Sequence, residues 1–303
     1  MSGAAPVRAV LFNPSARAGR AAALLPALRS ALPADVALHV PDSAEAALAL
    51  LHALPRGSRV VAVGGDGTLH RWLPALIERD HELGLVPLGS GNDVARALGL
   101  DREPPLAWVS HALNAPAGFI DLGLALWHDD QGRAQESHFI SSLSAGFDAA
   151  VARRALDGPA RLRGLPRYLW ATLRELAALR TWALDITVDG EHLHSGPALF
   201  AASLNTPTFG GGMPATPGAR THDGLLNVLL AGPFTRGGAL RMLPRLLRGR
   251  HLGHPRIRTQ AFESLLILAR GDLPLAADGE WLGLARSVQV VVRPSALRVV
   301  RKG

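Results

Sequence analysis

Cysteine is absent from this chain of 303 residues, and lysine occurs once, at Lys302. The lack of cysteine excludes disulfides, thiolate metal sites and cysteine nucleophiles, and it suits a cytoplasmic protein. A P-loop, a protein kinase and a Schiff-base enzyme each need a lysine at a defined place in a motif or pocket. The single lysine therefore excludes all three. The chain also lacks any apolar run of the roughly 18 residues that can span a bilayer.

Apolar residues make up 48% of the chain and charged residues 19%, so a substantial core can form and general disorder is excluded. The length fits one large or two ordinary domains. The net charge is +7, and arginine supplies nearly all of the positive charge. Arginine binds phosphate groups through its planar guanidinium fork. A net positive charge is typical of proteins that bind nucleic acid or an anionic membrane surface.

The segment from Val60 to Leu69, with the sequence VVAVGGDGTL, is the most informative part of the chain. A β-branched apolar run stops at a glycine-rich turn, and an amphipathic stretch follows at once. This order predicts a strand, a tight turn and a helix. Glycines let a bulky anion approach the backbone, and a helix start offers N–H groups to it. We expect the turn to hold a nucleotide phosphate, with Asp66 facing a metal ion bound to that phosphate. The residues of this turn are Gly64, Gly65, Asp66, Gly67 and Thr68.

A second glycine turn, Gly89-Ser90-Gly91-Asn92-Asp93, also ends a strand and opens a helix. Ser90 can donate to a phosphate or sugar oxygen, while Asn92 and Asp93 can bind nucleotide, hold the turn or cap the helix. Asn13 follows the first strand, and it either reaches adenine or phosphate or forms a turn with Pro14. Ligands of parallel sheets bind beyond the carboxyl ends of the strands. We therefore expect the two glycine turns to form one nucleotide site.

Strand-like and helix-like segments alternate over residues 1–120, which predicts a parallel sheet covered by helices. The predicted strands are 7–12, 36–40, 60–63 and 83–87, and the predicted helices are 21–32, 43–54, 69–78 and 93–98. The sequence thus predicts an α/β domain over 1–120, and the segment at about 294–303 is a candidate to return to it.

Short strand candidates dominate residues 121–293, which predicts a mainly antiparallel β domain. The candidates are 120–126, 138–143, 184–188, 198–204, 225–230, 264–268 and 287–292, with inserted helices at about 149–181 and 236–248. Asp189-Gly190 and Asp278-Gly279 have the chemistry of hairpin turns.

Asp278 and Glu280 lie two apart around a glycine, so in an extended strand their side chains would point to one face. Two close carboxylates can bind magnesium or take part in proton transfer. The alternative is a hairpin turn that carries two solvated acids.

Together these motifs resemble the diacylglycerol kinase catalytic-domain family, and in particular its soluble bacterial lipid kinases. GGDGT alone is moderately specific, because NAD kinases and phosphofructokinases share such a turn, whereas the ordered set is far more specific. The set spans nearly the whole chain: GGDGT at 64–68, PLGSGND at 87–93, GFD at 146–148, GGG at 210–212, Pro214, DGL at 223–225 and DGE at 278–280.

The resemblance implies an ATP-dependent kinase that phosphorylates a lipid hydroxyl. It implies a Rossmann-like nucleotide domain, similar to those of NAD kinases and phosphofructokinases, a C-terminal β-sandwich, and an active site between them. The ATP phosphates would bind at 64–68, with catalytic Mg²⁺ near Asp66. Ser90, where the family usually has threonine, would contact the nucleotide.

The resemblance also implies roles in the second half of the chain. Asp278 would be the general base for the lipid hydroxyl, with Glu280 nearby. A structural Mg²⁺ would bind the carboxylate of Asp223 and the backbone carbonyls of Arg220 and Leu225. One departure concerns His70 and Arg71, where the family commonly has asparagine and glutamate, so this chain performs the function of that pair differently or not at all.

The stretch from Thr235 to Arg258 contains seven arginines, interleaved leucines and no acidic residue. A basic amphipathic helix of this kind can lie on an anionic bilayer. The stretch from Arg161 to Trp182 is similar. The alternative is that both are surface helices whose apolar faces pack on the β domain.

These observations predict a cytoplasmic, peripherally membrane-associated kinase of a diacylglycerol-like or related lipid that uses ATP and Mg²⁺. One alternative is a kinase of a soluble substrate such as NAD or a sugar phosphate, which would leave the arginine–leucine stretch unexplained. Another is a non-catalytic lipid- or nucleic-acid-binding protein on a kinase scaffold. The presence of Asp66, Asp278 and Glu280 argues against it, and no nucleic-acid partner is expected.

Overall fold

The structure is a computed structural model that describes residues 7–159, 161–162 and 165–302. The parts of the predictions that extend over 1–6, 160, 163–164 and 303 lie outside these residues. The chain divides into two compact units, of which unit 1 is Met1–Ile120 with Ser295–Gly303 and unit 2 is Asp121–Pro294. None of the helices in the described residues is long and apolar enough to cross a membrane.

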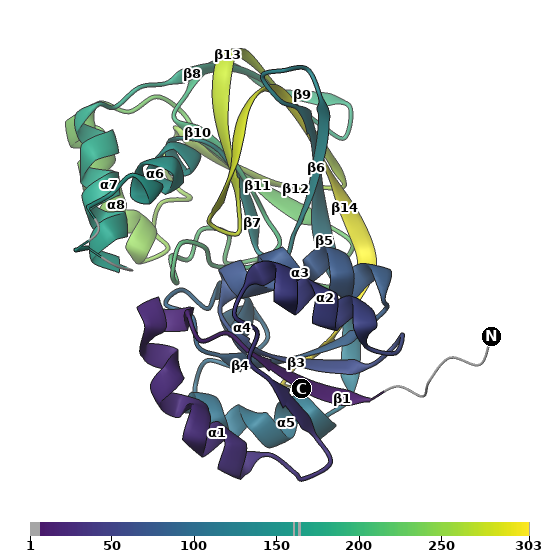
Figure 1. The fold of residues 1–303 in the computed structure, drawn as a ribbon. Coiled ribbons are helices and arrows are strands. Elements are labelled where there is room, and N and C mark those ends of the chain that lie inside the picture. Colours follow the sequence, from purple (N-terminus) through teal and green to yellow (C-terminus); the bar gives the residue numbers. More distant parts are fainter. Residues whose placement is uncertain (1–6, 160, 163–164, 303) are drawn as a thin grey trace. The chain divides into compact units, whose positions relative to one another are not determined.

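Unit 1 is built on a parallel sheet with the strand order β2-β1-β3-β4-β14 (Figure 1). The strands that begin in this unit are β1 (Arg8–Phe12), β2 (Ala37–His39), β3 (Arg59–Gly64) and β4 (Glu82–Pro87). The long strand β14 (Glu280–Val300) ends here, where Arg298 lies opposite Glu82 of β4. The central strands of this sheet, β1, β3 and β4, are buried on both faces. This explains why their sequences are nearly continuous apolar runs.

Helices cover both faces of this sheet. They are η1 (Ala16–Leu24), α1 (Leu25–Ala31), α2 (Ala44–Ala53), α3 (Asp66–Glu78), α4 (Asp93–Ala97), η2 (Pro105–Trp108) and α5 (Val109–Asn114). Leu28 of α1 and Val109 of α5 join one core cluster with Val10 and Val61, and Figure 1 shows α2 and α3 on the opposite face. The start of α2 is fixed by Ser43, whose hydroxyl oxygen accepts a hydrogen bond from the Ala46 amide at 3.0 Å.

Unit 2 is mainly antiparallel. Its strands are β5 (Ala117–His128), β6 (Ala134–Phe139), β7 (Ser142–Gly146), β8 (Trp182–Val188), β9 (Glu191–Ala198), β10 (Phe200–Leu204), β11 (Leu226–Ala231), β12 (Ile257–Phe262), β13 (Ser264–Ala277) and the first part of β14. The order is β12-β11-β10-β7-β13-β14, with β8 also pairing β13. Strand β13 changes register between Leu268 and Leu273, so its two halves pair with different strands, β8 and β7.

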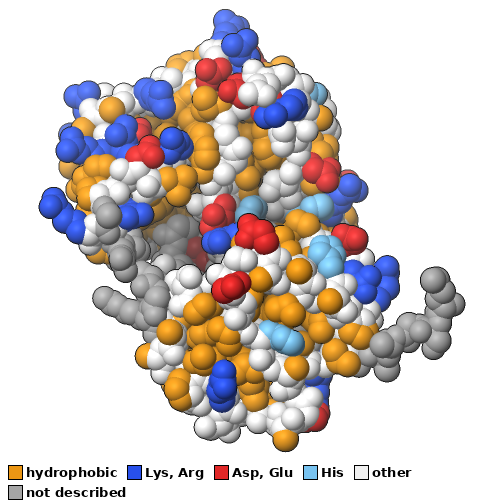
Figure 2. Space-filling view, in the orientation of Figure 1, with side chains coloured by type: hydrophobic (Ala, Val, Ile, Leu, Met, Phe, Trp, Pro, Cys, Tyr) orange, Lys and Arg blue, Asp and Glu red, His pale blue; other side chains and the backbone are white. Residues whose placement is uncertain are grey.

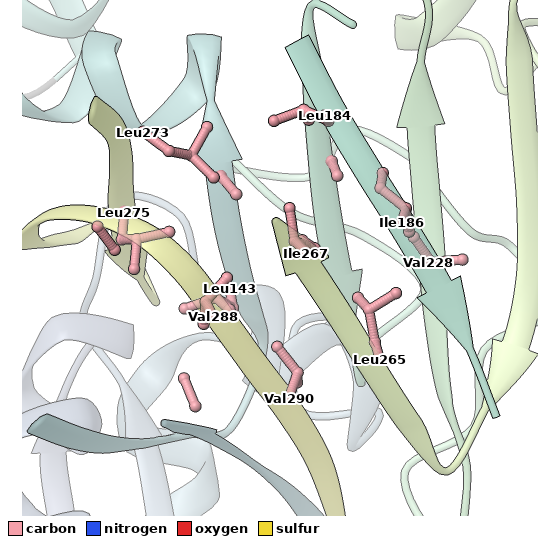
Figure 3. Close-up of a cluster of buried hydrophobic side chains, with 14 of the residues drawn as sticks. Leu143, Leu184, Ile186, Val228, Leu265, Ile267, Leu273, Leu275, Val288 and Val290 are labelled. Carbon is pink, nitrogen blue, oxygen red and sulfur yellow. The ribbon is translucent and has the colours of Figure 1, made fainter. Parts of the chain in front are cut away.

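The core of unit 2 lies between these strands. Figure 3 shows side chains from several strands meeting in it, among them Leu143 of β7, Ile186 of β8, Val228 of β11, Ile267 of β13 and Val290 of β14. This sandwich-like arrangement and the parallel α/β sheet of unit 1 confirm the predicted fold class.

Among the described residues of unit 2, the helices are α6 (Phe147–Leu156), α7 (Leu165–Ala177) and α8 (Arg236–Leu247). Met242 of α8 and the preceding Phe234 are buried in a second core cluster with Phe200 and Leu229. One face of α8 is therefore fixed on the sheet. The hairpin prediction is also confirmed, because Asp189-Gly190 joins β8 to β9 and Asp278-Gly279 joins β13 to β14, with positive φ at all four residues.

Candidate active site

The two glycine turns of unit 1 touch each other. Strands β3 and β4 pair so that Gly64 lies opposite Pro87, and the Leu88 amide donates to the Gly64 carbonyl at 2.7 Å. A Cβ on Gly65 would lie 2.5 Å from the Cα of Gly89. No side chain fits between the turns, so both positions require glycine.

Asn13 is joined to the first glycine turn from the neighbouring strand. Its amide donates to the Val63 carbonyl at 3.0 Å, and its side-chain Nδ2 donates to Thr68 Oγ1 at 2.7 Å. Its Oδ1 accepts from the Ser15 amide at 2.9 Å, so Asn13 also forms the turn that the sequence left open. Gly64 completes this arrangement, because a Cβ there would lie 2.8 Å from Thr68 Oγ1.

Asp66 connects the two turns through its side chain. Its Oδ2 accepts from the Asp93 amide at 3.0 Å and its Oδ1 from the Val94 amide at 3.2 Å, so Asp66 caps α4. The buried carboxylate of Asp93 accepts from Arg96 Nη1 at 2.8 Å. The structure thus puts Asp93 in a hydrogen-bonded pair within the first turn of α4.

Asn92 and Ser90 complete the second turn. Asn92 has a left-handed backbone, with φ of 54°, and its buried Oδ1 has no hydrogen-bond partner among the described residues. A Cβ on Gly89 would lie 2.5 Å from that oxygen. Ser90 is exposed beside it.

The two glycine turns and Asp66 have the chemistry that a nucleotide with bound magnesium requires. The two paired glycine turns and the start of α3 suit phosphate, since a helix start directs N–H groups at an anion. An ionised carboxylate has about four acceptor positions, so Asp66 can cap α4 and also serve as an oxygen ligand to a metal ion. The residues therefore fit the group.

Asp278 of unit 2 lies in the hairpin between β13 and β14, with φ of 49°, followed by Gly279 with φ of 84°. The inference that Asp278 and Glu280 share one face of an extended strand is therefore wrong, because a two-residue turn intervenes. The solvated-acid alternative is also wrong for Asp278, which is 9% exposed. Glu280 is half-buried at the first position of β14.

Three backbone amides hold the Asp278 carboxylate. Oδ2 accepts from Ile140 at 3.0 Å, and Oδ1 accepts from Ser141 at 2.8 Å and Ser142 at 3.0 Å. This explains why the single strand predicted over 138–143 is interrupted between β6 and β7. The amides of the interruption bind a side chain instead of a neighbouring strand.

A buried asparagine that the sequence analysis missed supports the same interruption. Asn205 is fully buried, and its Nδ2 donates to the carbonyls of Asp121 at 2.7 Å and Ile140 at 2.9 Å. Like Asn13, it directly follows an apolar strand, and that signal was available in the sequence.

The loop at 220–225 is tied down by two carboxylates. Asp121, buried and also missed, accepts from the Gly224 amide through Oδ2 at 2.7 Å, and Asp223 accepts from the Leu225 amide through Oδ1 at 3.2 Å. In the described part of the chain, no group of three or more His, Cys, Asp or Glu side chains is arranged to hold a metal ion. The predicted structural site uses one carboxylate and the carbonyls of Arg220 and Leu225, and it stays a prediction.

Asp148 opens α6 in the GFD motif, to which the sequence analysis gave no role. Its Oδ2 is buried and, among the described residues, has no hydrogen-bond partner. Burial disfavours the charged carboxylate and raises the pKa of Asp148 to about 7.

Two family descriptions match the sequence. The diacylglycerol kinase catalytic domain matches residues 8–124, and the YegS C-terminal NAD kinase beta sandwich-like domain matches residues 141–301. The chain belongs to the diacylglycerol kinase catalytic-domain family. As a member of this family of lipid kinases, it is an enzyme that phosphorylates a lipid.

Sequence similarity to individual diacylglycerol kinases supports this family assignment. A diacylglycerol kinase of Mycobacterium tuberculosis is 32% identical over 264 residues, which cover 86% of this chain and 82% of the relative. A diacylglycerol kinase of Bacillus subtilis is 26% identical over 246 residues, which cover 77% of each chain.

Solved structures confirm the fold. A diacylglycerol kinase structure from Bacillus anthracis matches with a TM-score of 0.67 at 17% identity, covering 98% of this chain and 97% of that one. An NAD kinase structure from Archaeoglobus fulgidus matches with a TM-score of 0.54 at 12% identity, covering 97% and 93%. The predicted NAD-kinase-like architecture is thereby confirmed for this member of the diacylglycerol kinase family.

Proposed function

We propose that this kinase transfers the γ-phosphoryl group of ATP to the hydroxyl of a diacylglycerol-like lipid. The close packing of Gly65 against Gly89 carries the proposal, because it brings the two glycine turns together at the carboxyl edge of β3 and β4. Such an edge is where parallel sheets bind their ligands, and family membership supplies the lipid acceptor.

The nucleotide would be held mainly by backbone. The turn at 64–68 would bind the phosphates through its amides and the start of α3. The exposed hydroxyl of Ser90, the backbone of Gly91 and the Asn13–Thr68 pair would contact the rest of the nucleotide, and Asn92 Oδ1 would accept from one of its donors. This arrangement needs no lysine.

Magnesium, when bound beside Asp66, would neutralise charge on the phosphates that react. The fixed orientation of the Asp66 carboxylate, set by the amides of α4, would prepare it for this contact. A second, structural magnesium would be held by Asp223 and the carbonyls of Arg220 and Leu225.

In the transfer, the lipid hydroxyl oxygen bonds to the γ-phosphorus, the bond from that phosphorus to the bridging oxygen breaks, and ADP leaves. The hydroxyl proton passes to a carboxylate, for which we propose Asp278, with Glu280 nearby. The amides of Ile140, Ser141 and Ser142 would orient this base.

The test offers the purified enzyme labelled ATP, Mg²⁺ and two acceptors in parallel: vesicles that contain dioleoylglycerol, and NAD as a soluble acceptor. We expect label in phosphatidic acid and none in NAD. A total lipid extract forms a third arm, which identifies a related lipid if dioleoylglycerol is a poor acceptor. Label in NAD alone, or no labelled product in any arm, would overturn the proposal.

We also propose that α7 and α8 associate with an anionic membrane. The two helices pack together, and Figure 2 shows arginines gathered over them with hydrophobic side chains in between. Leu173 of α7 is 63% exposed and Leu247 of α8 is 57% exposed. Such residues beside arginines suit the interface of an anionic bilayer, where apolar side chains insert and cations stay with the headgroups.

Replacement of Leu173 and Leu247 by serine tests the membrane proposal, because neither side chain supports the core. We expect weaker flotation with phosphatidylglycerol vesicles and an unchanged melting temperature. Replacement of Leu156, which is 60% exposed on α6 outside the two helices, is the matched control. Equal flotation of all variants would remove α7 and α8 from membrane contact.

A further inference from the structure

A basic pocket of about 600 Å³ lies at α8, and none of the predicted active-site residues lines it. It is formed by one face of the helix and the segments on either side. Its lining residues are Phe234, Gly238, Arg241, Met242, Arg245, His254, Pro255 and Arg256.

The charge of this pocket has one sign. Arg241 and Arg245 are four residues apart and so lie on one face of α8, and Arg256 reaches the pocket from the following segment. No acidic residue occurs between 235 and 258. In the described part of the chain, neither Arg241 nor Arg245 has a hydrogen bond or an ion pair from its guanidinium. The guanidinium groups of Arg241 and Arg245 are therefore available to bind an anion.

The wall of the pocket is fixed before any ligand arrives. Arg256 Nη1 donates to the Pro233 carbonyl at 2.8 Å, and its guanidinium lies 5.7 Å from the centre of the Phe234 ring. The same ring lies 5.2 Å from that of His254. Phe234 and Met242 are buried in the core, so the apolar floor is held by the sheet.

Gly238 lines the pocket without a side chain. A Cβ at this position would point to the capping Thr235, 3.2 Å from its Oγ1, and would lie 3.5 Å from Phe234 Cδ1. Any side chain there would therefore occupy space beside the aromatic floor.

We propose that this pocket binds the phosphate group of an anionic phospholipid. Arginine forks match phosphate geometry through paired N–H donors, and three converging arginines compensate its charge. The apolar floor of the pocket, formed by Phe234 and Met242, suits the glycerol and upper acyl region of a lipid rather than a free ion. The inference rests on the proposed function only in that the substrate is presented by a membrane.

The experiment measures binding without activity, so its failure is distinguishable from failure of the kinase proposal. The probe is dihexanoyl phosphatidylglycerol below its micelle concentration, titrated calorimetrically into the full-length protein; it carries a lipid phosphate group but is not the product of the proposed reaction. Diffuse attraction to a charged surface is absent in this format, so only a discrete site gives saturable binding.

Two double variants distinguish binding in the pocket from attraction to the general positive charge of the surface. R241Q/R245Q removes two charges inside the pocket, and R248Q/R250Q removes two exposed charges outside it. We expect the first pair to weaken binding more than tenfold and the second to change it less than twofold. Gly238→Ala keeps every charge and adds a methyl group to the lining beside Phe234, and we expect it to weaken binding as well.

The other outcomes overturn the proposal. Equal loss in both paired variants would show a diffuse basic surface. Inorganic phosphate that binds as tightly as the soluble lipid would show a site for a free anion. Displacement of the lipid by a short single-stranded DNA at physiological salt would indicate nucleic-acid binding. No saturable binding of the lipid would remove the site altogether.

Discussion

Asp66 accepts a hydrogen bond from the backbone amide of Asp93 at 3.0 Å, so the first glycine motif caps the helix that the second motif opens. The two motifs are 27 residues apart in sequence and are joined through one carboxylate. An aspartate that would assist a phosphate-bound metal ion thus also maintains the shape of the turn beside it. Its substitution should affect folding and catalysis together, and the two effects can be separated.

Asp66→Ala removes the cap of α4, and we expect a loss of about 1 kcal/mol in the free energy of unfolding, typical of a lost N-cap. The measurement is a denaturant titration without nucleotide or metal. Asp66→Asn retains one acceptor oxygen and should lose less stability, yet its turnover should fall as far as that of the alanine variant if the carboxylate charge assists the phosphates. An asparagine variant with near-normal turnover would leave Asp66 with the capping role alone.

Gly65→Ala should damage the nucleotide site, because its Cβ would lie 2.5 Å from the Cα of Gly89 and backbone cannot rotate away as a side chain can. Overpacking of this kind costs about 1–3 kcal/mol. We expect a lower melting temperature and a strong loss of ATP affinity, measured by calorimetry. Gly253→Ala is the control, since nothing lies within 4 Å of its added carbon. Unchanged ATP binding in Gly65→Ala would mean that the nucleotide lies elsewhere.

The sequence predicted the local structure around Asp66 well because its signals are local. The apolar run, the glycines and the amphipathic stretch around Asp66 determine a strand, a turn and a helix within 20 residues. The helix begins at Asp66 rather than Leu69, because Gly65 serves as its N-cap and the turn residues are already helical. Terminal residues of helices are the least determined by such patterns.

Unit 2 was less predictable because its decisive contacts are distant in sequence. The interruption after Phe139 depends on Asp278, 138 residues beyond Ile140, and local propensity carries no trace of it. The face shared by Asp278 and Glu280 was wrongly inferred from alternation, although the hairpin chemistry of Asp278-Gly279 was recognised in the same segment. Strand β13 extends nine residues beyond the predicted end at 268, because a register shift lets it change partners.

The roles of Asp278 and Glu280 can be distinguished by their isosteric amides. In Asp278→Asn, Oδ1 can keep the bonds from Ser141 and Ser142, while the new amide group faces the Ile140 N–H. We expect a loss of about 1–3 kcal/mol in stability for that unsatisfied donor. If Asp278 is the base, turnover should fall by about 10²–10⁴-fold, with ATP affinity nearly unchanged.

Glu280→Gln is the matched comparison, since Glu280 is half-buried at the start of β14 and binds none of those three amides. We expect a smaller loss of turnover than in Asp278→Asn and no loss of ATP affinity. A larger loss in Glu280→Gln than in Asp278→Asn would transfer the role of base to Glu280.

Asp148 should make the stability of the enzyme depend on pH. Burial raises its pKa from 3.8 to about 7, so between these values the folded protein binds a proton that the unfolded chain does not. The stability that this group contributes is present below pH 3.8 and is lost as the pH rises through about 7. Asp148→Asn cannot ionise, so the melting-temperature difference between the variant and the parent should grow in favour of the variant up to about pH 7 and then level off. Other titrating groups are common to both proteins and cancel in this difference. Parallel melting curves from pH 5 to 8 would show that Asp148 ionises normally, in contact with solvent or with a partner.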